Sequence, residues 1–160
     1  HNSSGVSLTV STDCLLEGAD ERLVSAIRDR LTIDNPQYVA AKRYGRWIGK
    51  RLKPTLSYYD VVPEGLRFPR GFSNKAVLLV REIMGVEPHI VDNRRRLAEH
   101  RFSFKGSLRK YQSAAVDAVC ARSFGVLEAG TGSGKTVMAL GAMARRMQPT
   151  LVIVHTKELL

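Results

Sequence analysis

Apolar and polar residues alternate at the start of the chain, and a helical period follows. In residues 6–11 (VSLTVS) every second residue is apolar, which predicts a half-buried strand. In residues 20–31 (DERLVSAIRDRL) the apolar positions recur at helical spacing behind an acidic first turn, which predicts an amphipathic helix. The chain is therefore expected to open with a strand and a helix.

Two more helices are predicted by the residues at their ends. The Asn-Pro pair at 35–36 is a helix-start signal, because Asn caps free amides and Pro fits the first turn, so a helix is expected over residues 38–44. Ser73 or Asn74 can cap the second helix, and Gly85 is placed to end it.

Strands are expected between and after these helices. Residues 54–62 (PTLSYYDVV) are rich in β-branched and aromatic residues, and a Pro-Glu-Gly turn at 63–65 separates them from the apolar stretch 66–68, which predicts a hairpin. Residues 89–92 can form one more strand. The charged stretch 92–106 has no sustained apolar period and predicts a linker or domain edge at its end.

A new pattern begins after residue 106. Ser107 is expected to cap a helix. The apolar residues of that helix lie on one side, and they are Leu108, Tyr111, Ala115 and Val119. The short apolar run 124–127 (FGVL) that follows is typical of a buried parallel strand.

A second helix and a second strand are expected next. Residues 135–147 have helical spacing, with Val137, Leu140 and Met143 predicted to face inward. Residues 151–154 (LVIV) then predict another buried strand. Strand, helix and strand in this order form a βαβ unit, which implies a parallel sheet with a right-handed crossover.

The composition predicts a packed core and an anionic partner. The 160 residues are 44% hydrophobic and 25% charged, which is close to the globular average and allows one ordinary domain or two small ones. Lys and Arg outnumber Asp and Glu by 25 to 15, which gives a formal net charge of +10. Nucleic acid is the favoured partner, and the alternative is a basic protein whose charge only keeps it soluble.

Cysteine usage and hydropathy point to a soluble protein. Cys14 and Cys120 lie in different segments without nearby metal-ligand partners, so both are expected to be reduced and structural. The sequence has no long apolar run and no signal-peptide pattern, so a cytoplasmic protein that does not enter a membrane is expected. Residues 1–5 are consistent with a tag or cloning remnant and are left out of the fold prediction.

The candidate chemistry is concentrated in residues 129–136 (AGTGSGKT), which fit the phosphate-loop pattern. Glycines let successive backbone amides turn inward and form a nest for phosphate oxygens at the positive end of the next helix. Lys135 adds a charge on the transferred phosphate, and the Thr136 hydroxyl is placed to ligate Mg²⁺, so these two are the catalytic candidates. The predicted ATP-binding residues of the loop are Gly130, Thr131, Gly132, Ser133, Gly134, Lys135 and Thr136.

Other interpretations of the loop stay open at this point. A Gly-rich turn can be only a tight connection, although a Gly-Lys-Thr sequence between an apolar run and a helix favours the phosphate loop. A small P-loop kinase or a GTPase has the same local spacing, but the Asn-Lys-x-Asp motif of GTPases does not occur. A nucleic-acid-binding module with a vestigial loop is the remaining alternative.

The residues before the loop narrow the class. Residues 108–112 (LRKYQ), followed by residues 128–136, resemble the opening of superfamily 2 helicases, particularly the type III restriction, UvsW-like and xeroderma pigmentosum group B-like branch. The resemblance implies a RecA-like domain that uses ATP and Mg²⁺ and acts on DNA, with RNA as the alternative. It also implies that Gln112, with Arg109, recognises adenine, whereas the residues alone also allow Gln112 to be a surface helix residue.

The end of the chain adds a further resemblance. Residues 154–160 (VHTKELL) resemble motif Ia of this family, which has Pro-Thr in place of His-Thr. This implies contacts of Thr156 and Lys157 with a nucleic-acid backbone, and an ordinary strand-to-helix turn capped by Thr156 is the alternative. The family's Asp-Glu motif does not follow the loop, so the chain is expected to be a fragment that binds nucleotide without turnover and has the rest of the motor as its partner.

The first part of the chain resembles the accessory α/β domain that precedes the motor in bacterial and phage members of this branch, on residues 35–38, 43–46, 66–72 and 92–94. Its predicted nucleic-acid contacts are basic residues that interleave Tyr44 and Trp47, namely Lys42, Arg43, Arg46, Lys50 and Arg51. Arg67, Arg70 and residues 94–96 would add to this surface if the fold brings them together. The alternative is a solvated helix end with both aromatic residues in a small core.

The expected fold is therefore α/β in two parts. Residues 1–104 are predicted to form a small α+β accessory domain that binds nucleic acid. Residues 105–160 are predicted to form the first part of a RecA-like P-loop domain with a parallel sheet.

Overall fold

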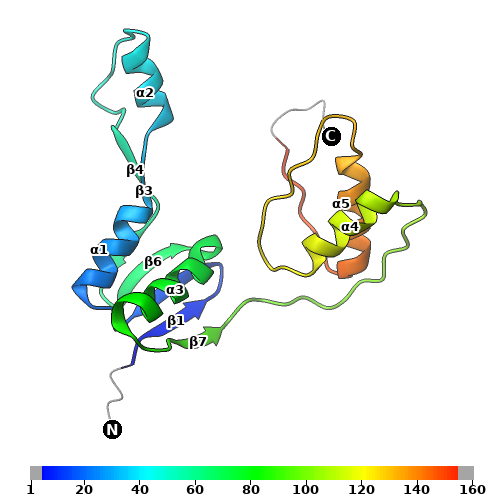
Figure 1. Ribbon diagram of the computed structural model, residues 1–160, viewed down its shortest axis with the longest axis horizontal. Coiled ribbons are helices and arrows are strands. Elements are labelled where there is room, and N and C mark those ends of the chain that lie inside the picture. The colour runs from blue at the N-terminus through cyan, green and yellow to red at the C-terminus, as the bar shows by residue number, and fades with distance from the viewer. Residues whose placement is uncertain (1–4, 155–160) are drawn as a thin grey trace. The chain divides into compact units, whose positions relative to one another are not determined.

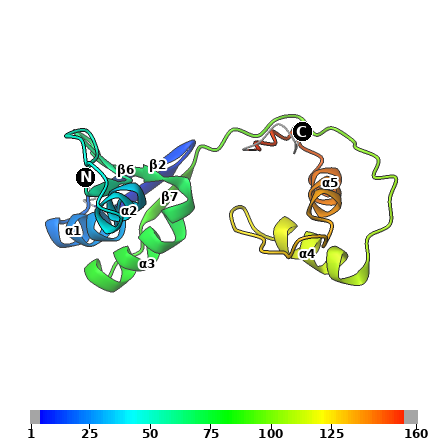
Figure 2. The same ribbon diagram turned by 90° about the horizontal axis from the view of Figure 1, so that it is seen from above.

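A computed structural model describes residues 5–154 of the chain. The chain divides into two compact units, His1–Arg95 and Arg96–Leu160. Residues 93–109 contain no helix or strand, and Figure 2 shows them as a continuous connecting trace. The division lies ahead of residue 104, where the charged stretch predicted the domain edge. Each unit is described on its own below.

A five-stranded sheet forms the centre of the first unit (Figure 1). Its strand order is β5-β6-β2-β1-β7, in which β1 and β7 are parallel and all other neighbours are antiparallel. The mixed sheet confirms the α/β class predicted from the sequence. The strands are β1 (Ser7–Val10), β2 (Asp13–Glu17), β5 (Asp60–Val62), β6 (Gly65–Pro69) and β7 (His89–Asp92).

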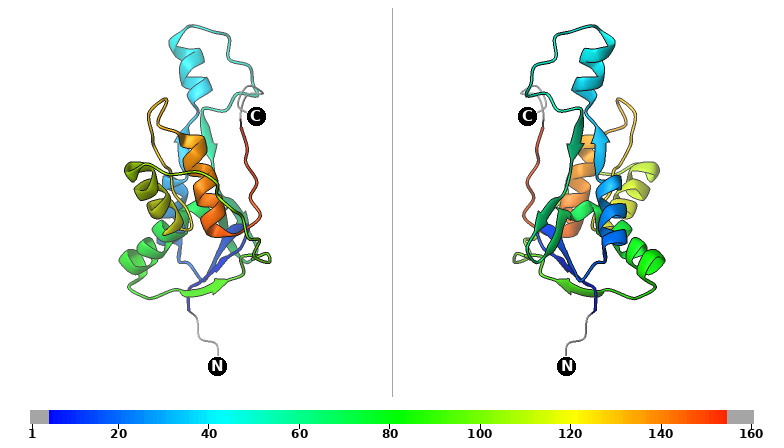
Figure 3. Two further views of the ribbon diagram at one scale, coloured as in Figure 1. Left: turned by 90° about the vertical axis from the view of Figure 1, so that its right-hand side faces the viewer. Right: turned by 90° about the vertical axis from the view of Figure 1, so that its left-hand side faces the viewer.

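Two helices, α1 (Glu21–Arg30) and α3 (Ser73–Met84), cover one face of this sheet, as Figure 3 shows. Strand side chains that alternate in burial point toward them, so the period-2 and helical patterns of the sequence meet in one core. The core residues are Leu8, Cys14, Leu16, Leu66 and Phe68 from the sheet, Leu23 and Ile27 from α1, and Ala76, Leu79 and Val80 from α3.

The ends of these helices follow the sequence signals only in part. Asp20 caps α1 by accepting a hydrogen bond from the Leu23 backbone amide at 2.8 Å, and this bond lowers the pKa of the Asp20 carboxyl. Gly85 ends α3 in the left-handed conformation with φ of 66°. The prediction that Ser73 or Asn74 caps α3 is wrong, because the helix already includes Ser73 and follows Phe72 without a side-chain cap.

Gly65 begins β6 at a point where no side chain fits. Its φ is 155°, and a Cβ added there would lie 2.0 Å from the carbonyl oxygen of Leu16 on the neighbouring strand β2. Gly65→Ala is expected to lower the free energy of unfolding by about 3 kcal/mol or more, since backbone strain costs about 1–3 kcal/mol and the clash adds to it. Thermal or urea unfolding measures this change.

Gly85→Ala is the matched control for Gly65→Ala. Gly85 also has a positive φ, 66°, but a Cβ added there meets nothing within 4 Å. This variant should therefore lose only the conformational term of about 1–2 kcal/mol. Equal destabilisation by the two substitutions would contradict the close approach of β6 to β2.

Both cysteines are free thiols, as the sequence predicted. Cys14 is fully buried in the core of the first unit. Burial, with a smaller contribution from Asp13, raises the pKa of the Cys14 thiol to about 11. The thiol is therefore protonated at neutral pH and acts as a small apolar core residue.

A two-stranded ribbon carries a helix away from the sheet (Figure 1). We call residues 32–57 the arm and residues 44–53 its tip. The Asn-Pro start signal correctly predicted the helix of the arm. Its elements are β3 (Thr32–Asp34), α2 (Pro36–Arg43) and β4 (Thr55–Ser57), and β3 and β4 pair antiparallel.

Asn35 fixes the junction between the ribbon and α2. Its side-chain oxygen accepts from the Gln37 amide at 3.0 Å, and its side-chain nitrogen donates to the Lys53 carbonyl at 2.8 Å. The Asn35 backbone amide donates to the Pro54 carbonyl at 2.8 Å. Asn35 is only 6% exposed, and these bonds satisfy its buried polar groups.

The second unit contains two packed helices, α4 (Lys110–Cys120) and α5 (Lys135–Arg146). Val116 of α4 and Met138 and Gly141 of α5 are buried there. A Cβ added at Gly141 would lie 3.3 Å from the Leu108 side chain and 3.5 Å from the Val116 side chain on α4. The glycine therefore lets α4 and the segment just before it pack closely against α5. No helix within residues 5–154 is both long enough and apolar enough to cross a membrane.

Two predictions for these helices are wrong. Ser107 does not cap α4, because Arg109 is the N-cap residue. The inward face predicted for α5 is also wrong, since Val137 is 38% exposed and Leu140 50% exposed, whereas Met138 and Gly141 are buried. The reason is that α4 packs on the side of α5 that holds a glycine, where the backbones can approach closely.

The two buried strands predicted for the second unit are absent from its described residues. Residues 124–127 and 151–154 form no strand, and the exposed fractions are 94% for Val126 and 84% for Ile153. A buried parallel strand needs hydrogen-bonding neighbours and covering helices, and these two segments pair with none in the described part. Within residues 96–154 the predicted βαβ unit and its parallel sheet are therefore not formed.

Candidate functional site

The Gly-rich loop leads directly into the N-terminus of α5. Gly132 and Gly134 have φ of 80° and 81°, which is the left-handed region that glycine adopts without strain. The Ser133 amide donates to the Gly130 carbonyl at 3.3 Å and closes the turn between them. Gly134 is the N-cap of α5 and has no side chain to cap it. The first amides of α5 are therefore available to an anion.

Lys135, the first residue of α5, reaches back along the loop. Its ammonium group donates to the carbonyl oxygens of Ala129 and Gly130, at 3.0 Å each. The positive charge is therefore held beside the same turn whose glycines expose their amides. Thr136 follows on the first turn of α5 and is exposed.

Two features of the loop suit it to an anion such as the terminal phosphates of a nucleotide. A Cβ added at Gly130 or Gly132 meets nothing within 4 Å, so the space over both residues is open. The Ser133 hydroxyl oxygen is buried and has no hydrogen-bond partner among the described residues. Buried polar groups are normally paired, and an acceptor such as a phosphate oxygen would satisfy this one.

The helix α4 is tied to the loop through two consecutive side chains. The Tyr111 hydroxyl and the Gln112 side-chain nitrogen both donate to the Ser133 carbonyl, at 2.9 and 3.0 Å. The Gln112 side-chain oxygen accepts from the Arg109 amide at 2.9 Å. Gln112 is 6% exposed, so it is not a surface helix residue. Sequence patterns had assigned Tyr111 to the apolar side of the helix and had missed its contact with the loop.

Tyr111→Phe is expected to weaken ATP binding about two- to tenfold, because it removes one hydrogen bond that fixes the Ser133 carbonyl and leaves the aromatic ring in place. Isothermal calorimetry with ATP and Mg²⁺ measures the change. Phe124→Leu, at a 66% exposed position outside these contacts, is the control and should bind as the wild type does. Unchanged affinity in Tyr111→Phe would show that the loop holds its shape without α4.

The arm carries basic side chains and two exposed aromatic side chains that alternate with them in the sequence. Tyr44 is 68% exposed and Trp47 is 89% exposed, which excludes the alternative that both are buried in a small core. The Arg46 guanidinium lies 5.8 Å from the centre of the Tyr44 ring. Within residues 5–154, the ion pairs do not include the basic side chains of this region, Lys42, Arg43, Arg46, Lys50, Arg51 and Lys53.

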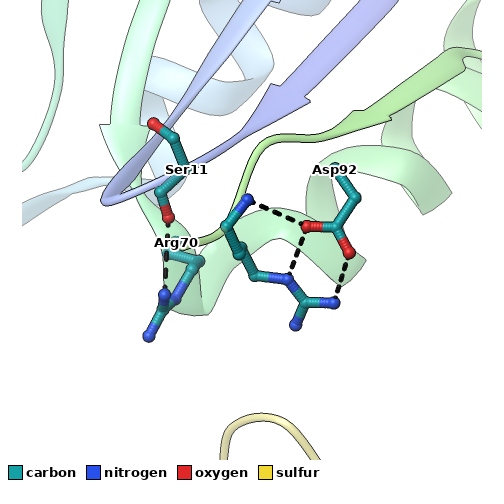
Figure 4. A network of polar contacts seen from close by, with 4 residues as sticks. Ser11, Arg70 and Asp92 are labelled. Atoms are coloured by element: carbon teal, nitrogen blue, oxygen red, sulfur yellow. Dashed lines mark hydrogen bonds and ion pairs between the residues drawn. The ribbon is translucent and has the colours of Figure 1, made fainter. Parts of the chain in front are cut away.

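Three of the other arginines considered for this surface make contacts at the sheet. Arg70 donates to the Ser11 carbonyl at 3.4 Å, and Arg94 forms an ion pair with Asp92 at 2.6 Å (Figure 4). Arg67 lies 3.4 Å from Asp13. These three side chains are therefore engaged outside the tip. Thr156 and Lys157 lie outside the described residues, and their contacts stay a prediction.

A comparison with known protein families bears on the class of the phosphate loop. Residues 105–160 match the family model described as Type III restriction enzyme, res subunit. This match supports a helicase-like superfamily 2 domain over these residues, which include both the LRKYQ segment and the loop. Comparisons with curated proteins and with solved structures give no match.

Proposed function

We propose that this chain is part of an ATP-dependent DNA helicase or translocase that acts in repair, recombination or restriction. The observation that carries the proposal is the loop of residues 130–134, which has two left-handed glycines, the Lys135 ammonium beside it and an uncapped α5 N-terminus behind it. The family match over residues 105–160 favours a helicase motor over a small kinase or a GTPase.

In this proposal the loop holds the terminal phosphates of ATP. Amides of residues 132–136 donate to phosphate oxygens, and the Lys135 ammonium exchanges its two carbonyl acceptors for the γ-phosphate. The Thr136 hydroxyl would hold Mg²⁺, which supplies charge neutralisation between the phosphates when it is bound. The chain's own contribution is to position the phosphates and to stabilise negative charge.

Gln112 would recognise adenine next to Arg109, and it has groups left to do so. Each of its two amide ends makes one bond within the protein, so one N–H and one lone pair remain. This pair matches the acceptor and donor that adenine presents on one edge. Gln112 would then contact both adenine and the Ser133 carbonyl, so adenine binding would affect the position of that carbonyl in the loop.

DNA would be engaged by the arm of the first unit. Lys42, Arg43, Arg46, Lys50 and Arg51 offer positive charge that no described ion pair neutralises. Contacts of this kind bind phosphates without reading sequence, so affinity should fall steeply with salt. The proposed accessory domain and the proposed ATP-binding part thus bring two different anionic ligands to one chain.

The test is a nucleotide titration of the 160-residue chain. ATP with Mg²⁺ should bind more tightly than GTP with Mg²⁺, because Gln112 is proposed to recognise adenine. Absence of nucleotide binding at millimolar ATP would refute the proposal.

A further inference from the structure

The tip of the arm exposes the one tryptophan of the chain to solvent. An indole ring gains free energy when it is buried, so an 89% exposed Trp47 needs another explanation than packing. The arm has no core that could use it, because α2 contains no buried residue. The indole instead lies over Gly49, where an added Cβ would be 2.9 Å from the ring.

The charge around this ring is of one sign. From residue 35 to residue 59 the sequence contains no Asp or Glu, and the tip itself contributes Arg46, Lys50, Arg51 and Lys53. Cations that lack acidic partners are available to bind phosphates. A flat exposed ring near them in the sequence offers a stacking surface for a base. A base in the interior of a duplex has both faces covered by its neighbours, whereas an unpaired base can present a free face.

We propose that the tip binds single-stranded DNA, with an unpaired base stacked on Trp47 and its flanking phosphates held by the cations of the tip. The inference rests on the proposed function and deepens it by naming unpaired nucleotides as the ligand of the arm. Stacking is tolerant of sequence, so the tip distinguishes single strands from duplexes and does not distinguish one base from another.

Trp47 also reports on its own contact, because its fluorescence is the tryptophan signal of the whole chain. The chain is titrated with an oligo-dT, with an abasic oligomer of the same number of phosphates, and with a long duplex whose two ends are few compared with its interior base pairs. Binding of each labelled DNA is followed by anisotropy in parallel. Oligo-dT should quench the emission at saturation, whereas the abasic oligomer and the duplex should bind through phosphates and leave the emission nearly unchanged.

Variants separate stacking from charge. Trp47→Ala should weaken oligo-dT binding roughly 5- to 100-fold, and it should leave binding of the abasic oligomer within about twofold, because stacking alone is removed. Trp47→Phe keeps an aromatic face and should recover most of the affinity. Tyr58→Ala, at a 46% exposed aromatic residue outside the tip, is the control and should bind as the wild type does.

The outcomes distinguish this inference from the function on which it rests. If oligo-dT binds by anisotropy but the Trp47 emission does not change, or if Trp47→Ala binds oligo-dT as tightly as the wild type, the stacking site is refuted and DNA binding stands. Equal quenching by the abasic oligomer also refutes stacking. If neither oligomer nor duplex binds, DNA engagement by the arm and the stacking site both fail.

Discussion

Lys135→Ala is expected to raise the dissociation constant for ATP with Mg²⁺ by roughly 10- to 100-fold. The substitution removes the ammonium that lies 3.0 Å from the Ala129 and Gly130 carbonyls, where the γ-phosphate is proposed to bind. A hydrogen bond to a charged group contributes about 1.5–3 kcal/mol, which corresponds to this range of affinity. Isothermal calorimetry of both proteins under the same conditions measures it.

The control for this prediction is Lys105→Ala, which removes the same charge from an exposed position in the connecting stretch. It should change ATP affinity less than about twofold, since exposed charges are screened by salt. Because Lys135 is exposed and contacts only the loop, its loss should leave the packing of α4 and α5 intact. An ATP affinity that is equal in wild type and Lys135→Ala would contradict a phosphate site at the loop.

Arg43→Glu combined with Arg46→Glu is expected to abolish most DNA binding by the first unit. Each lost phosphate contact lowers the slope of log affinity against log salt by about 1, so the slope should fall by about 2 or more. Affinity at low salt should fall on the order of tenfold or more, because the new carboxylates repel the DNA backbone. Fluorescence anisotropy at a series of salt concentrations gives both quantities.

Arg30→Glu combined with Lys75→Glu makes the same change in net charge outside the arm, on α1 and α3. Both positions are exposed, so the control tests long-range charge without touching the proposed contacts. It should keep nearly the wild-type salt slope. If both double variants lose affinity to the same extent, the protein binds DNA through its net charge and the arm has no special role.

Local signals predicted most of the first unit, because alternation, helical period and end residues are contained within each element even where its partner strand is distant in the sequence. Alternation around Leu8 predicted β1, and Asn35 with Pro36 predicted the start of α2. The strand β2 was missed because Leu15 interrupts the alternation of Cys14 and Leu16, so its five residues show no clear period. The turn at Gly65 was expected, but its close approach to β2 is a tertiary contact that sequence patterns do not contain.

In the second unit, the hydrophobic pattern alone was not sufficient to predict the strands or the buried helix face. The apolar runs 124–127 and 151–154 have the composition of buried strands, yet composition does not supply the neighbouring strands that would bury them. The same limit explains α5, whose buried face is set by Gly141 and the contact with α4 and does not follow from counting apolar residues.

The loop of the candidate site could be predicted from the sequence, but the hydrogen bonds from α4 that support it could not. The sequence of residues 129–136 implies the turn, and the positive φ of Gly132 and Gly134 agrees with the reason for those glycines. Hydrogen bonds from Tyr111 and Gln112 to Ser133 depend on how two helices pack, which no local spacing encodes. The exposure of Trp47 likewise depends on the ribbon that carries the tip away from the core.

The central claim is that backbone amides around Ser133, together with Lys135, bind the terminal phosphates of a nucleotide. Amide resonances of Gly132, Ser133, Gly134 and Lys135 in a ¹⁵N-labelled chain test it most directly, during titrations with ATP and Mg²⁺, with inorganic triphosphate and with adenosine. Saturable shifts are expected at these amides with ATP and with triphosphate, and much smaller shifts with adenosine, which reaches the loop only through the Gln112 contact with the Ser133 carbonyl. Resonances that stay unchanged at millimolar ATP, or that shift equally with adenosine, would contradict it.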